Sequence, residues 1–155
     1  MKNLLFAALL AVSSQSAAAD WEMVPETEFC IARNSVDWGN GNIGESRFGW
    51  HQELIFISAI NLEWNIKTSK ENPLEEEAVA DFDGRKVPVM VLSNEPHTLI
   101  VVVDGSAQNL DTIVKSKVMK IYPKGSYEDY VFGLELDRMT QAISLVGQCY
   151  FTTKA

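Results

Sequence analysis

The sequence contains few of the residues on which enzyme chemistry most often depends. Its 155 residues include two histidines and two cysteines, and histidine supplies much of the acid–base chemistry at neutral pH and many metal ligands. His97 follows Pro96 in a predicted surface turn, and the residues around His51 show no pattern of further metal ligands. Nucleophile-elbow, phosphate-loop and dinucleotide-binding motifs are also absent from the sequence. We therefore expect a protein that is not an enzyme and that needs neither a metal nor a cofactor.

A hydrophobic run long enough to span a membrane is missing as well. Residues 4–12 are apolar, but about nine residues fall well short of the roughly 20 that cross a bilayer. A lysine precedes this run and three alanines, residues 17–19, follow it, which is the pattern of a cleavable signal peptide. We expect residues 1–19 to be the signal peptide, cleaved before Asp20. Residues 20–155 are then expected to form a single β-rich domain that is periplasmic or secreted and has no transmembrane segment.

Basic residues are in the minority, with 13 lysines and arginines against 21 aspartates and glutamates and a formal net charge of −8. Nucleic acid and anionic lipid repel such a protein, whereas basic partners are attracted to it. Glutamates are concentrated in residues 71–77, and this like-charge run predicts a solvated loop. We expect the partner to be a protein or a glycan, and not a nucleic acid.

What the sequence does contain is hydrophobic alternation between turn-forming residues, which predicts β-strands. Residues 62–67 alternate most clearly, because Leu62, Trp64 and Ile66 point to one face. Residues 54–57 are apolar on both faces and predict a strand deeper in the sheet. Further strands are expected at residues 28–32, 78–82, 86–92, 98–103, 118–122 and 130–136.

One hairpin turn and two helices complete the expected fold. Asp83-Gly84 favours a tight hairpin turn over a calcium-binding loop, because the glutamate that such a loop needs is missing. Pro88 lacks a backbone donor and predicts an edge or bulged strand. Residues 107–116 predict a short helix, and Asp137 is the expected N-cap of a C-terminal amphipathic helix. The apolar positions of that helix are Met139, Ala142, Ile143, Val146, Cys149 and Tyr150. The expected fold class is α+β, with mostly antiparallel, sandwich-like β structure and these two helices.

Both cysteines occupy inward-facing positions of the expected elements. Cys30 lies in the first expected strand, and Cys149 lies on the apolar stripe of the last helix. Two cysteines in an exported chain commonly form a disulfide. We expect a bridge between Cys30 and Cys149 that closes a loop of about 120 residues and locks the last helix onto the first strand. A pair of buried free thiols is the alternative.

Residues 34–50 have the most unusual composition, because they mix glycine, asparagine and aromatic residues. Two interpretations are open. In the first, the segment is a binding surface whose aromatic and polar members are Trp38, Phe48, Trp50, Arg47 and Asp37. In the second, it is a hairpin around Asn40-Gly41 whose aromatic residues cap one end of the core. We favour the second interpretation and keep Trp38, Arg47, Phe48 and Trp50 as the candidate binding surface.

The C-terminal pattern resembles a known family. A strand at residues 130–136 runs into a small amphipathic helix, which is similar to the ending of the invasion-associated locus B family of exported proteobacterial proteins. The resemblance covers mainly the C-terminal third, together with the early cysteine and the Leu-Glu-Trp of residues 62–64. A glycine that often opens the last helix in the family is replaced by Arg138. The resemblance implies a β-rich, cysteine-paired protein of the cell envelope that is linked to host association, and it carries over no catalytic residue.

These observations favour an exported, non-enzymatic binding protein of the bacterial cell envelope. The first alternative is an inhibitor of a basic hydrolase such as a lysozyme or a protease, because small acidic envelope proteins with a disulfide can act in that way. The second alternative is a small envelope enzyme whose site the sequence does not reveal.

Overall fold

The computed structural model describes residues 20–24, 29–51, 53–123 and 132–153, and the predicted signal peptide lies outside them. In this part of the chain, nine strands form one antiparallel sheet and two helices accompany it. The strands are β1 (Glu22–Met23), β2 (Ile31–Asp37), β3 (Ile43–His51), β4 (Leu54–Ile60), β5 (Leu74–Phe82), β6 (Arg85–Ser93), β7 (Thr98–Asp104), β8 (Val118–Pro123) and β9 (Phe132–Glu135). The helices are α1 (Ala107–Lys115) and α2 (Met139–Thr153).

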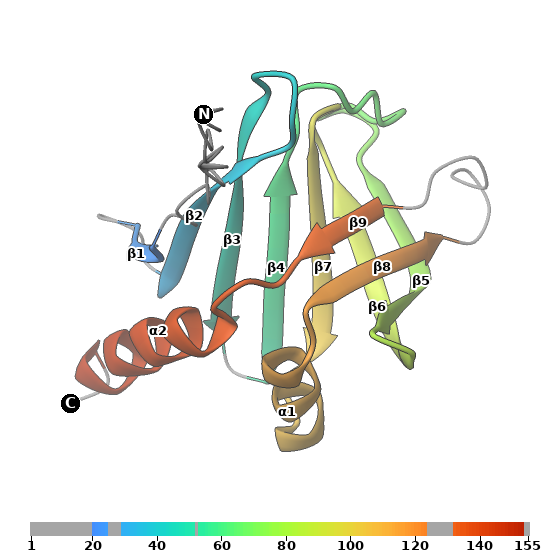
Figure 1. Cartoon of the computed structure of the whole chain (residues 1–155). Coiled ribbons are helices and arrows are strands. Elements are labelled where there is room, and N and C mark those ends of the chain that lie inside the picture. Colours follow the sequence, from blue (N-terminus) through green and yellow to red (C-terminus); the bar gives the residue numbers. More distant parts are fainter. Residues whose placement is uncertain (1–19, 25–28, 52, 124–131, 154–155) are drawn as a thin grey trace, which may run out of the picture.

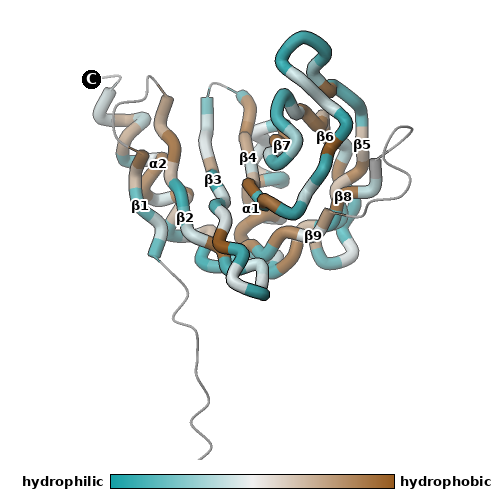
Figure 2. The backbone as a smooth tube through the Cα atoms, turned by 90° about the horizontal axis from the view of Figure 1, so that it is seen from above, coloured by the Kyte–Doolittle hydropathy of each residue, from teal (hydrophilic) through white to brown (hydrophobic). Residues whose placement is uncertain are grey.

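The sheet curls so strongly that its last strands return over its own face. Its strand order is β1-β2-β3-β4-β7-β6-β5-β8-β9, and Figure 2 shows the curl from above. In Figure 1, β8, β9 and α2 pass in front of the central strands β3, β4 and β7. The predicted fold class, mostly antiparallel and sandwich-like with two helices, is confirmed.

The hydrophobic core lies on the side of the sheet that β8, β9 and α2 cover, which we call the inner face. Phe48, Ile57 and Val101 come from three neighbouring strands and are at most 2% exposed. Ala142 and Val146 of α2 belong to the same cluster and are fully buried. Burial of so much apolar surface is the main force that holds the sheet in its curled form.

The start of α2 differs by one residue from the prediction. Arg138 has a φ of 55°, and its carbonyl oxygen accepts the hydrogen bonds of Gln141 N at 2.9 Å and Ala142 N at 3.4 Å. Arg138 therefore occupies the capping position that was predicted for Asp137. A positive φ favours glycine, which is the residue that the resembled family often has there. Trp21 supports this corner, because its Nε1 donates to the carbonyl of Asp137 at 2.8 Å.

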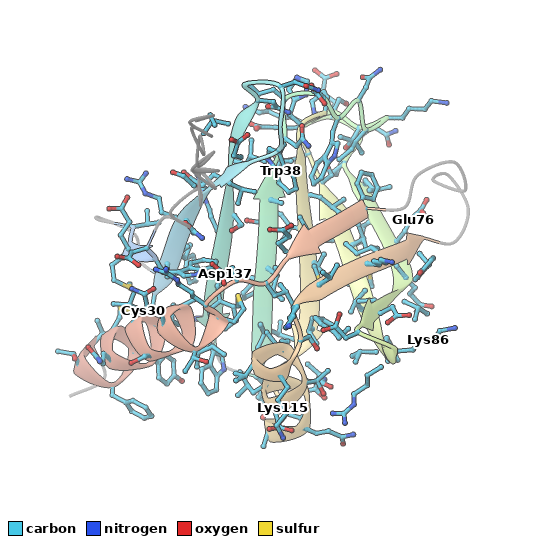
Figure 3. All side chains as sticks on the ribbon, in the orientation of Figure 1. Cys30, Trp38, Glu76, Lys86, Lys115 and Asp137 are labelled. Atoms are coloured by element: carbon cyan, nitrogen blue, oxygen red, sulfur yellow. A yellow bond between two sulfur atoms is a disulfide. The ribbon has the colours of Figure 1, made fainter. Side chains whose placement is uncertain are left out.

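The predicted disulfide is confirmed. Cys30, directly before β2, is bonded to Cys149 of α2, and their Cα atoms are 5.7 Å apart. Figure 3 places Cys30 beside α2. The bond ties α2 to the edge of the sheet at β1 and β2, which α2 also contacts.

Residues 62–67, predicted as the clearest strand, do not form one. Directly after β4, the side-chain oxygen of Asn61 accepts a hydrogen bond from Glu63 N at 2.9 Å, and its carbonyl accepts one from Trp64 N at 3.1 Å. Leu62, which was expected inside, is 63% exposed. The prediction is wrong because the local hydrogen bonds of an asparagine offer the backbone a turn, whatever the hydrophobic alternation that follows.

Most other predicted strands are present with shifted bounds. The first, expected at residues 28–32, is β2 and begins at Ile31. Residues 78–82 form part of β5, which begins at Leu74, so the second half of the acidic run is strand and not a solvated loop. The strand expected at residues 130–136 is β9, whose first two predicted residues lie outside the described chain.

The predicted hairpin turn is confirmed, because Asp83 and Gly84 have φ values of 49° and 94° between the paired strands β5 and β6. The edge strand predicted from Pro88 is wrong for β6 as a whole, but Pro88 itself lies at an unpaired part of the strand. β6 lies inside the sheet, but its ladder with β7 covers only Met90 to Leu92. Pro88 thus lies where β6 is not paired with β7, a position that tolerates a missing donor.

Candidate functional site

Residues 34–50 form a β-hairpin, as the second interpretation predicted. Strands β2 and β3 pair along their length, and the chain reverses through Gly39, Asn40 and Gly41, which have φ values of 91°, 53° and 77°. Trp38 N donates to the carbonyl of Asn42 at 2.9 Å and closes the turn. The glycines and the asparagine of residues 39–41 are therefore explained by the turn.

Trp38 caps the core at one end of the sheet. Its indole Nε1 donates to the carbonyl of Ile60 at 3.0 Å, and its ring packs against Trp64 with centroids 5.6 Å apart. Figure 3 places Trp38 at the end of the sheet opposite to α1. This residue supports the fold and is remote from the other members of the predicted surface.

We expect Trp38→Ala to lower the free energy of unfolding by about 2 to 3 kcal/mol, because the substitution removes a half-buried ring and leaves a carbonyl without its donor. Urea denaturation measures this value. Leu62→Ala, at a 63% exposed position nearby, is the control and should change stability little. A variant at Trp38 with unchanged stability would instead favour a role in binding.

Phe48 is not part of any surface, and this element of the predicted binding surface is wrong. Its side chain is 0% exposed and points to the inner face, where it belongs to the core. Neighbouring residues along a strand point to opposite faces. The side chain of Arg47 therefore lies on the outer face, on the opposite side of the sheet from Phe48.

The outer face of the central strands is apolar and has none of the described helices or strands over it. Both helices and strands β8 and β9 contribute to the core on the inner side. On the outer side, cross-strand pairing places Phe56 beside Val102 and then Met90, and places Ile100 beside Leu92. These five side chains are all half-buried. Large uncovered apolar patches are uncommon on monomeric soluble proteins and often mark interaction sites.

A hollow of about 340 Å³ lies on this outer face, over β2, β3, β4 and β7, and we call it the outer hollow. Its lining consists of Phe29, Cys30, Ile31, Arg47, Gly49, Trp50, His51, Phe56, Ser58 and Ile100. The volume falls in the range of small-molecule sites, which begins at about 300 Å³. The outer hollow therefore unites two of the predicted surface residues, Arg47 and Trp50, with residues that the sequence did not single out.

Gly49 opens the outer hollow. It is the cross-strand neighbour of Ile31 on β2 and of Phe56 on β4, so a side chain is missing between two large ones. A Cβ at this position would lie 3.4 Å from Ile31 Cγ1, which is ordinary contact, and the backbone does not need glycine for its φ. Glycine inside a strand weakens the strand and often marks the close approach of a ligand.

The two ends of the outer hollow differ in chemistry. At one end, Phe29 is 49% exposed and packs edge-on against His51, with ring centroids 5.0 Å apart. At the other end, Arg47 lies directly across from Ser58 on β4 and from Arg33 on β2. The hollow is thus apolar along its length and carries cations at one rim.

Acidic residues only partly engage these arginines. Arg47 Nε contacts Glu45, which is its only partner among the described residues. Arg33 Nε lies 2.8 Å from Glu22 Oε1, and its Nη1 lies 3.8 Å from Glu45 Oε2. Among the described residues, the printed acidic contact of Arg47 is through Nε and leaves its terminal guanidinium nitrogens without an acidic partner.

Trp50 belongs both to the hollow and to the packing of α2. Its indole stacks on Tyr150 with ring centroids 6.1 Å apart and 7° between the planes. The ring of Trp50 therefore packs on the inner side of β3. Its contact with Tyr150 links the outer hollow to α2, which the disulfide anchors.

The described residues place neither histidine in a group of metal-ligating side chains. Within them, no group of three or more histidine, cysteine, aspartate or glutamate side chains is placed to hold a metal ion. His97 is exposed, with Nδ1 2.6 Å from the carbonyl oxygen of Trp64, and His51 packs against Phe29.

The chain matches no protein-family model, no curated protein and no solved structure. The function proposed below therefore rests on the geometry of the outer hollow.

Proposed function

We propose that this chain is an exported, non-enzymatic binding protein of the bacterial cell envelope, and that it binds through the outer hollow. The observation that carries the proposal is the apolar hollow that Gly49 opens on an uncovered face of the sheet. A water-exposed apolar hollow is costly, and filling it with an apolar group recovers that free energy.

The compartment agrees with the covalent structure. The Cys30–Cys149 bond is typical of proteins that fold in an oxidising environment outside the cytoplasm. In the described part of the chain, neither helix has the length and the hydrophobicity that crossing a bilayer requires.

The experiment is a titration with Nile Red, an uncharged apolar dye whose fluorescence rises in apolar surroundings. We expect the wild-type protein to bind the dye, and Gly49→Leu to weaken binding at least about tenfold because the new side chain fills the hollow. Stability should be unchanged or slightly raised, since glycine is unfavourable within a strand.

Gly133→Leu is the matched control. Gly133 lies in β9, and a Cβ there would have no atom within 4 Å, so the same substitution leaves the outer hollow untouched. Equal dye binding by the wild type and Gly49→Leu would show that the outer hollow is not the site.

A further inference from the structure

We propose that the natural ligand of the outer hollow is an amphiphile with an unbranched hydrocarbon tail and one anionic head group, such as a fatty acid. This inference rests on the proposed function and specifies its ligand. It follows from the shape of the hollow, the poverty of its lining in polar groups, and the position of Arg47 at its rim.

The shape fits a narrow tail. Because Gly49 has no side chain, the outer hollow forms a narrow trough between Ile31 and Phe56. Ile100 adds a further apolar side chain to its lining. At roughly 30 Å³ for each water-sized group, a volume of about 340 Å³ accommodates about eleven methylene-sized groups. From His51 to Arg47 the trough follows four residues of β3, a span of about 14 Å. A tail of about twelve carbons matches this space.

The lining excludes more polar ligands. A sugar or a peptide backbone brings many donors and acceptors, each of which needs a partner when it is buried. Beneath the trough the lining offers hydrocarbon from Ile31, Phe56 and Ile100, and polar side-chain atoms gather towards the ends. A hydrocarbon tail has no donors or acceptors that need a partner in the hollow.

The rim selects the charge of the head group. Arg47 and the hydroxyl of Ser58 are cross-strand neighbours, and both line the hollow. Arg33 lies across from Arg47 on the other side. An arginine fork pairs well with a carboxylate or a phosphate, and a neighbouring hydroxyl adds a further donor. Glu22 and Glu45 also contact these two arginines, so an anionic head group would have to share or replace these ion pairs.

The test compares four twelve-carbon compounds as competitors of Nile Red, each below its critical micelle concentration: dodecanoate, dodecyl phosphate, dodecanol and dodecyltrimethylammonium. We expect both anions to displace the dye at concentrations at least about tenfold lower than the alcohol or the cation. The two anions distinguish a carboxylate from a phosphate head group.

Arg47→Met is the decisive variant, because it keeps the apolar stem of the side chain and removes the charged guanidinium. We expect it to weaken dodecanoate about tenfold to a hundredfold more than it weakens dodecanol, because the alcohol has the same tail and no charge. Arg47→Lys should recover part of the affinity. Arg85→Met is the matched control, because this exposed arginine lies at the β5–β6 hairpin and donates to Thr112.

The outcomes separate the ligand class from the proposed function. If Nile Red binding depends on Gly49 but the four competitors act equally, the anionic amphiphile is overturned and the binding site stands. If Nile Red binding does not depend on Gly49, both proposals fail. If sedimentation shows a dimer that Gly49→Leu dissociates, the occupant is a second copy and the amphiphile is overturned.

Discussion

Phe48→Ala should lower the free energy of unfolding by about 3 to 5 kcal/mol, the usual cost of removing a buried aromatic ring. The side chain of Phe48 is 0% exposed and packs on the inner face with residues of neighbouring strands and α2. Its loss leaves a cavity that the rigid sheet cannot close. Urea denaturation followed by circular dichroism measures the change.

Phe151→Ala is the control for this prediction, because the same substitution there removes a ring that is 73% exposed. It should change stability by less than about 0.5 kcal/mol. A small effect at Phe48, or equal effects at both positions, would contradict the assignment of the inner face and would return Phe48 to the surface of residues 34–50.

Replacing both Cys30 and Cys149 by serine should lower the free energy of unfolding by about 2 to 5 kcal/mol. The bond spans 119 residues, and so large a loop strongly restricts the unfolded chain. The double substitution avoids the free thiol that a single one would leave. Thermal unfolding of the wild type and the double variant measures the loss.

Reducing the wild-type protein is the control, because it breaks the same bond without changing the sequence. It should lower stability to the level of the double variant and should have no effect on that variant. Two titratable thiols in the denatured wild-type protein without reductant, or an equally stable double variant, would contradict a structural role for the bond.

The sequence predicted most of the strands and both helices because their patterns are local. The alternation of apolar residues predicted the bounds of β6 and β7 to within one residue. The helical spacing of apolar residues predicted α1 and α2. The failure at residues 62–67 has a physical cause. The hydrogen bonds of Asn61 stabilise a turn directly after β4, and the alternating pattern of the following residues does not reveal this turn. The cap of α2 was misplaced by one residue because the positive φ of Arg138 has no signal in a non-glycine residue.

The outer hollow could not be predicted from the sequence, because it depends on the registers in which four strands pair. Ile31, Gly49, Phe56 and Ile100 belong to four different strands, and the sequence does not show which of them become neighbours. One signal was present: residues 54–57 are apolar on both faces. We interpreted this pattern as a deeply buried strand, whereas one face belongs to the core and the other to the hollow.

A second sign was Gly49, an isolated glycine within an alternating strand, which the composition of residues 34–50 concealed. The glycines of the turn are explained by their positive φ values, and Gly49 has no such need. Separating these two kinds of glycine requires the backbone conformation, because both read alike in the sequence.

The disulfide also simplifies the oxidation step that the protein requires. β2, β3 and β4 are consecutive neighbours in the sheet, as are β5, β6 and β7, so each meander can form from a short stretch of chain. The bond joins the beginning of the first meander to the last helix, and the folded sheet holds these two ends together. With two cysteines in the chain, only one intramolecular pairing exists. Maturation therefore needs an oxidant but no isomerase to reshuffle wrong bonds.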